Sequence, residues 1–174
     1  MNLCKKIKSF FKETPMSSFE KHMEFIMKWE AGYVNDPNDT GGETKYGISK
    51  RQYPNLDIAN LTKEDASEIY KRDYWDKCRC DEIPEFMRLA VFDTAVNCGV
   101  VKAIMLLQEV INEIIDGIIG KKTIKNANRA SDPKDFLTRY MTGRILYYTK
   151  LKQFERYGKG WIKRSVNLIT EEVS

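Results

Sequence analysis

The chain has 174 residues, of which 42% are apolar and 31% are charged, and its formal net charge is +4. This length is typical of one compact domain, or of one domain with a small appendage. The composition excludes a collagen-like, low-complexity or wholly disordered protein. Because charged and polar residues interrupt every long apolar stretch, we also expect no transmembrane helix.

The start of the chain is basic and amphipathic. Residues 1–12 carry four lysines and no acid, and their apolar side chains recur at helical spacing. This pattern predicts a basic leader over residues 1–16, which is frayed, packed on the body or bound to an anionic membrane surface. The leader lacks the apolar run and the cleavage site of a secretory signal peptide.

The next segment predicts a capped helix that leads into a small hairpin. Ser17 and Glu20 have the spacing of a capping box, and apolar residues then follow one stripe of a helix over residues 18–30. Glu30 falls where that stripe would continue. Residues 32–47 are rich in Gly, Asn and Asp, which predicts turns and one or two short strands.

The rest of the chain is predicted to be helical. Cap signals and apolar periodicity predict helices over residues 62–75, 85–96, 101–115 and 122–130. A last long helix is predicted to start at Asp132-Pro133 and to end before Gly158 and Gly160 interrupt it. The predicted fold is mainly α, with a small β-hairpin near the N-terminus. We expect a leader over residues 1–16, a catalytic region over 17–112, and a helical region over 113–174 packed with it as one body.

Cysteine and histidine give no sign of a metal centre. The four cysteines are too few for a disulfide scaffold and lack paired CxxC motifs, so we interpret them as reduced thiols. His22, the single histidine, lies on the apolar stripe and is interpreted as a core residue. No metal or cofactor is therefore expected.

Glu30 is the strongest candidate for chemistry. Burial beside Trp29 and a position near a helix C-terminus are each expected to raise the pKa of its carboxyl group. A carboxylic acid that keeps its proton near neutral pH is suited to general acid catalysis. The following polar segment offers Asp36, Asp39 and Thr44 as partners that orient water. An acid together with such a water-orienting group is what glycoside hydrolysis requires. The structural alternative is that Glu30 only pairs at a helix end.

These residues resemble the signature of the glycoside hydrolase family 108 muramidases, which include phage endolysins and lysozyme-like proteins described as secretion activators. The resemblance is carried by Trp29-Glu30-Ala31-Gly32-Tyr33 and by Thr40-Gly41-Gly42-Glu43-Thr44-Lys45-Tyr46-Gly47, followed by Asp73-Tyr74-Trp75 and Phe92-Asp93 to Asn97-Cys98-Gly99. Ala31 departs from the usual glycine of the family. The last third, with Asp116-Gly117 and Gly160-Trp161-x-x-Arg164, is similar to the predicted peptidoglycan-binding domain that accompanies this module.

The resemblance implies a lysozyme-like helical muramidase that cleaves the β-1,4 bond between N-acetylmuramic acid and N-acetylglucosamine. The family glutamate corresponds to Glu30 as general acid. We assign Asp39 first, and Asp36 second, to activate or position water, with Thr44 as the group that orients it. Residues expected to contact the saccharide are Tyr33, Tyr46, Asn97 and Trp161. For Trp161, a core aromatic role is the open alternative.

Peptidoglycan is therefore the expected partner, and the protein is expected to act as a monomer. It would be made in the cytoplasm and reach the cell wall by holin-type or other non-Sec release. Residues 134–164 carry nine Lys or Arg against two acids, which also suits an anionic wall polymer or membrane surface. The alternative is a non-catalytic, peptidoglycan-binding secretion accessory. A nucleic-acid partner is not expected, because the aromatic and basic residues fit an amphipathic helix better.

Overall fold

The computed structural model describes residues 16–30, 32–34 and 42–172. Helix α2 spans Ser18–Glu30, and the predicted capping box is present at its start. The backbone N–H of Ser17 donates to Glu20 Oε2 at 2.7 Å, and the N–H of Glu20 donates to Ser17 Oγ at 3.3 Å. The helix therefore begins as the sequence predicts. The predicted leader lies outside the described residues, apart from Met16.

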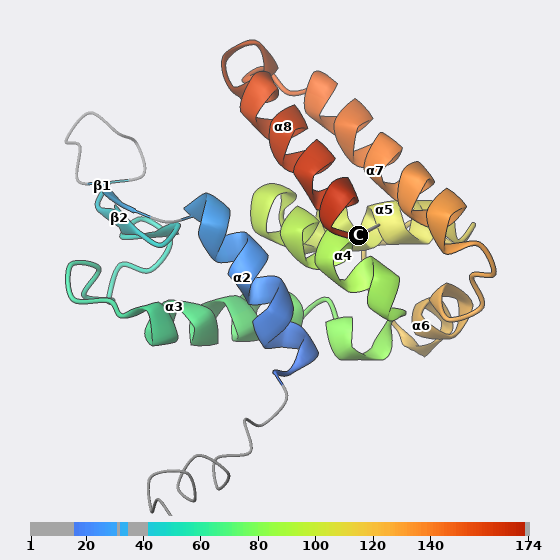
Figure 1. The fold of residues 1–174 in the computed structure, drawn as a ribbon, viewed down its shortest axis with the longest axis horizontal. Helices are drawn as coiled ribbons and strands as arrows, with labels where there is room; N and C mark the ends of the chain where they lie inside the picture. The colour runs from blue at the N-terminus through green and yellow to red at the C-terminus, as the bar shows by residue number, and fades with distance from the viewer. Residues whose placement is uncertain (1–15, 31, 35–41, 173–174) are drawn as a thin grey trace, which may run out of the picture.

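A small antiparallel sheet follows α2. Its strands are β1 (Tyr33–Val34), β2 (Thr44–Lys45) and β3 (Ile48–Ser49), in the order β1-β2-β3. Tyr33 pairs with Lys45, and Lys45 pairs with Ile48. In Figure 1 this sheet lies beyond the C-terminal end of α2, so the turn between β2 and β3 can approach Glu30.

The central helices follow the predicted cap signals. Helix α3 (Lys63–Tyr70) starts at a complete capping box of Thr62 and Asp65 and continues into a π-helical turn over Lys71–Trp75. After a 3₁₀ turn over Cys80–Glu82, helix α4 runs over Glu85–Cys98. It ends at Cys98, two residues later than predicted, and Gly99 follows as its C-cap.

Helix α5 is shorter than predicted. It spans Val100–Val110 instead of residues 101–115. Asn112 has a φ of +54°, which ends the helical path, and the Gln108 side chain ties down the loop beyond it. Gln108 Oε1 accepts from the N–H of Gly117 at 2.8 Å, and its Nε2 donates to Asp116 Oδ1 at 2.7 Å. Helix α6 then covers Lys121–Ala127.

The prediction of one long last helix broken at Gly158 and Gly160 was wrong. The chain forms two helices, α7 (Pro133–Thr149) and α8 (Phe154–Glu172), and both glycines lie inside α8. A β-carbon on Gly158 would lie 2.6 Å from Phe154 Cε2, so the missing side chain leaves room for the Phe154 ring against the helix. Packing of that ring offsets the low helix propensity of glycine.

Helix α4 lies at the centre of the molecule and contacts α2, α5, α7 and α8 (Figure 1). Trp75 is fully buried in an aromatic cluster, with ring centroids 5.3 Å from Phe92 and 5.5 Å from Phe19. His22 stacks on Trp75, and its Nδ1 lies 2.6 Å from the Ser18 carbonyl oxygen, as expected of a core histidine. The mainly helical fold is confirmed. No helix among the described residues is long and apolar enough to cross a membrane.

Candidate functional site

Glu30 is the last residue of α2, and its side chain is 22% exposed. The turn between β2 and β3 lies directly against it. Gly47 has a φ of +73°, and a β-carbon there would lie 2.7 Å from Glu30 Oε2 and would also clash with the Tyr70 hydroxyl. Only glycine fits this position, because both the backbone conformation and the space exclude a side chain.

Tyr70 supports the same turn from α3. Its hydroxyl donates to the Tyr46 carbonyl oxygen at 3.0 Å. Burial, followed by the negative charge of Glu30, raises the pKa of Tyr70, so its phenol stays protonated as a donor. The turn is thus held in place beside the Glu30 carboxylate.

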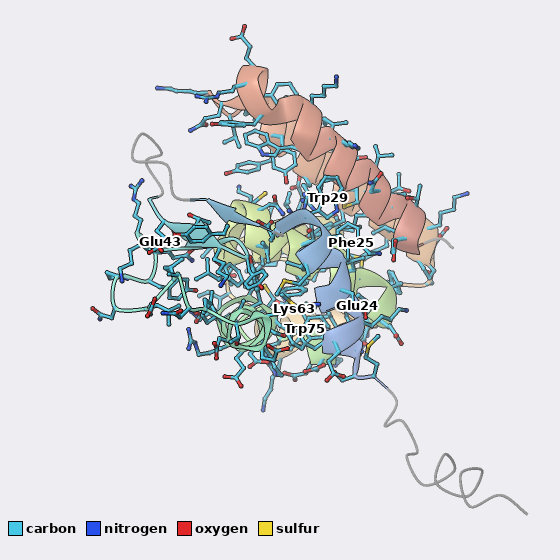
Figure 2. The ribbon with its side chains drawn as sticks, turned by 60° about the vertical axis from the view of Figure 1, so that its left-hand side comes forward. Glu24, Phe25, Trp29, Glu43, Lys63 and Trp75 are labelled. Carbon is cyan, nitrogen blue, oxygen red and sulfur yellow. The ribbon has the colours of Figure 1, made fainter. Side chains whose placement is uncertain are left out.

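A guanidinium group from α8 reaches Glu30 on its other side. Arg164 Nη1 lies 2.5 Å from Glu30 Oε1, and Arg164 Cζ lies 5.7 Å from the centroid of the Trp29 ring. Figure 2 shows Trp29 at the end of α2 that faces α8, with Glu43 directly before strand β2 of the neighbouring sheet. This cation comes from the other end of the chain, and no sequence pattern around Glu30 indicates it.

Arg164 is itself part of a buried ion cluster. Its Nε donates to Asp93 Oδ1 at 2.8 Å, and its Nη2 lies 2.6 Å from the same oxygen. Asp93 Oδ2 lies 2.6 Å from Arg144 Nη2, and Arg144 Nε donates to the Tyr148 hydroxyl at 2.8 Å. Asp93 and Arg144 are fully buried. The cluster pairs two carboxylates with two guanidinium groups and joins α2, α4, α7 and α8.

The carboxylates of this cluster stabilise the charged form of its guanidinium groups. Burial alone would lower the pKa of Arg164, but the carboxylates of Asp93 and Glu30 outweigh it and raise that pKa above its ordinary value. The same holds for Arg144 beside Asp93. Both guanidinium groups therefore remain charged inside the protein.

Of the hairpin residues predicted for the site, Tyr33 and Thr44 lie in the small sheet beyond the C-terminal end of α2. Asp36 and Asp39 fall outside the described residues. Thr44 is half-buried on β2, and its hydroxyl donates to the Gly42 carbonyl oxygen at 3.1 Å. Tyr33 is 50% exposed on β1 and donates to Glu43 Oε1 at 2.9 Å, which leaves its ring open to solvent.

The other predicted contact residues are more enclosed. Tyr46 is half-buried and has a φ of +51° in the turn beside Glu30. Asn97 is turned back on α4, where its Nδ2 donates to the Asp93 carbonyl oxygen at 2.9 Å. Trp161 stacks on Tyr148 with ring centroids 5.0 Å apart, so it has a packing role in α8.

Sequence reasoning missed Asp93, Arg144 and Arg164 as site residues. A signal existed for Asp93, since an acid inside the strongly apolar helix 85–98 needs a buried partner. Nothing local identifies that partner, because Arg164 is 71 residues further along the chain. The steric demand on Gly47 is likewise visible only once α2, α3 and the turn are placed together.

A groove of about 860 Å³ lies between α2 and α3, away from this site. Phe19, Met23 and Met27 contribute apolar side chains to it, and acidic residues of both helices also line it. Glu30 is not among its lining residues. We place the candidate site at Glu30, because Arg164 and the β2–β3 turn at Gly47 converge there.

Two family models match adjacent parts of the chain. Residues 23–99 match Glycosyl hydrolase 108, and residues 102–166 match the Predicted Peptidoglycan domain. The chain is also similar to the solved structure of Brucella abortus SagA, with 29% sequence identity and a TM-score of 0.80. That alignment covers 90% of this chain and 94% of the Brucella chain. No curated protein matches the chain. The region that contains Glu30 and Asp93 is therefore a domain of the glycosyl hydrolase 108 family, and it is followed by a predicted peptidoglycan domain.

Proposed function

We propose that the protein is an N-acetylmuramidase that hydrolyses the β-1,4 bond between N-acetylmuramic acid and N-acetylglucosamine in peptidoglycan. The observation that carries the proposal is the Glu30 carboxylate, partly exposed at the end of α2 inside the glycosyl hydrolase 108 domain. The β2–β3 turn at Gly47 contacts it on one side, and Arg164 contacts it on the other. A carboxyl group fixed in this way can donate its proton to the leaving oxygen of a glycosidic bond.

The second catalytic group is proposed from the sequence. Asp39 is the first choice to activate or position water, Asp36 is the second, and Thr44 orients the water. Thr44 lies on β2 of the same small sheet whose β2–β3 turn contacts Glu30. This placement supports the hairpin as the source of the second group.

The C-terminal domain is proposed to hold the enzyme on the cell wall. Of the nine cationic side chains in residues 134–164, Arg144 and Arg164 are buried in the ion cluster. Seven are exposed, namely Lys134, Arg139, Lys150, Lys152, Arg156, Lys159 and Lys163. These seven supply the positive surface for an anionic wall polymer.

The decisive experiment is product analysis on purified, insoluble peptidoglycan. We expect new reducing ends on muramic acid from the wild-type protein and none from Glu30→Gln, with Glu24→Gln on the exposed face of α2 as the matched control. Reducing ends on glucosamine would contradict the assigned bond. Activity in the Glu30→Gln variant would contradict the role of Glu30. If the wild-type protein binds the wall without releasing any saccharide, the non-catalytic accessory replaces the enzyme as the better interpretation.

A further inference from the structure

We propose that Arg164 is a positioning residue for the Glu30 carboxylate, so that the predicted peptidoglycan domain supplies part of the hydrolase site. This inference rests on the proposed function, because it assumes that Glu30 is the general acid. Glu30 and Asp93 lie in the segment that matches Glycosyl hydrolase 108, whereas Arg144 and Arg164 lie in the segment that matches the Predicted Peptidoglycan domain. The ion cluster thus crosses the boundary between the two domains.

The geometry of the guanidinium group fixes its direction. Arg164 Nε and Nη2 both contact Asp93 Oδ1, at 2.8 and 2.6 Å, which leaves Nη1 to reach Glu30 Oε1. Because the guanidinium group is planar and rigid, its contact with Asp93 determines where Nη1 points. The side chain of Arg164 is only 7% exposed, so water competes little for these contacts.

The support behind Arg164 is fixed as well. Asp93 is fully buried between Arg164 and Arg144, and the Tyr148 hydroxyl holds Arg144 from the adjacent helical turn. On the outer side, the Trp29 ring packs near the Arg164 guanidinium group. Arg164 is therefore oriented before any saccharide binds, as preorganised catalysis requires.

This contact also distinguishes the two oxygens of Glu30. Oε1 accepts from Arg164, so the proton of the acid form belongs on Oε2, the oxygen that faces the Gly47 turn. Among the described residues, the charged and titratable groups around the carboxylate are Arg164 from α8 and Tyr70 from α3, with Asp93 behind the guanidinium group. Tyr70 stays protonated and neutral, so Arg164 is the charged contact that the test removes.

The test compares Arg164→Met with Arg164→Lys on a soluble peptidoglycan saccharide, which avoids effects on wall binding. For Arg164→Met we expect kcat to fall by about 10²-fold with KM changed less than about threefold. Arg164→Lys keeps the charge but not the planar fork that holds Asp93 and aims Nη1 at Glu30, so its kcat should also fall with KM little changed.

Arg129→Met is the matched control, because Arg129 is an exposed arginine in the same predicted peptidoglycan domain, in the turn after α6. It should keep the kcat and KM of the wild type. All assays should be run well below the unfolding temperature of each variant. If Arg164→Met does not fold, Arg164→Lys decides alone, and wild-type kcat in that variant overturns the proposal.

Glu30→Gln separates this inference from the proposed function. If Glu30→Gln stays active, the proposed function itself fails. If Glu30→Gln is inactive but folded Arg164→Met keeps the wild-type kcat, only the positioning role is overturned. Arg164 would then be part of a structural ion cluster alone.

Discussion

Gly47 approaches Glu30 so closely that a β-carbon on the glycine would lie 2.7 Å from the Glu30 Oε2 atom. Gly47→Ala should therefore displace the carboxylate as well as strain the backbone. We expect kcat to fall by about 10²-fold, together with a loss of at least about 1 kcal/mol in the free energy of unfolding.

Gly42→Ala provides the control for that experiment. Gly42 has a similar φ of +68°, but a β-carbon there would meet nothing within 4 Å. It should lose similar stability and keep most of its kcat. Equal losses of kcat in the two variants would show that backbone strain, and not contact with Glu30, causes the effect.

Asp39→Asn and Thr44→Ala should reduce turnover more than stability. If these side chains activate or orient water, each variant should lose roughly 10²-fold or more in kcat. Denaturant unfolding would check that the fold is retained. Asp36→Asn is the matched comparison, and a larger loss in that variant would transfer the role from Asp39 to Asp36.

Asp93→Asn should strongly destabilise the protein. The variant leaves two buried guanidinium groups with one carboxylate, and breaking a buried ion pair on one side costs about 3 to 5 kcal/mol. Asp135→Asn removes an exposed pair with Arg139 and should cost less than about 1 kcal/mol. A loss below 1 kcal/mol for Asp93→Asn, measured by denaturant unfolding, would contradict the importance of the cluster.

Binding to the cell wall should depend on salt and on the exposed cations of α7, of α8 and of the loop between them. Raising the ionic strength from 0.1 to 1 M shortens the Debye length from about 10 Å to about 3 Å, so sedimentation with insoluble peptidoglycan should decrease. The triple variant Lys150→Glu, Lys152→Glu and Arg156→Glu should bind poorly even at low salt. A control that reverses three exposed charges on α2 and α3, Lys21→Glu, Lys28→Glu and Lys63→Glu, should bind better. Equal binding by both variants would show that the C-terminal charges are not the wall contact.

His22 should make stability depend on pH. Burial lowers the pKa of His22 in the folded protein below its ordinary value of about 6.5. The unfolded chain therefore takes up the proton first, and the free energy of unfolding should decrease as the pH falls below about 6.5. Denaturant unfolding between pH 7.5 and 5.5 should show this slope in the wild type and a smaller slope in His22→Gln. An unchanged slope in the variant would assign the effect to other groups.

Local patterns predicted the fold well where the interactions are local. The capping boxes at Ser17 and Thr62 connect residues three positions apart, and both helices begin where these signals place them. The boundary between α7 and α8 was missed because Gly158 was interpreted by its propensity alone. Its actual role is to make room for the ring of Phe154.

The candidate site was likewise predicted only where its signals are local. The apolar stripe of α2 and the polar hairpin are sequence features, and they were enough to single out Glu30. The contact with Arg164 joins residues 134 positions apart, and no periodicity connects them. Asp93, in the middle of α4, was the one available sign of this contact, since a buried carboxylate requires a cation from elsewhere in the chain.

The ion cluster limits how this architecture can be recombined. A chimera that joins residues 1–99 to the C-terminal region of another protein inherits a fully buried Asp93 without its two arginines. Each of the two joined domains would be intact, and the chimera would still contain the unneutralised charge of Asp93 in its core. The replacement region must therefore bring guanidinium groups at the positions of Arg144 and Arg164, and exchange between relatives should succeed only when both arginines are transferred together.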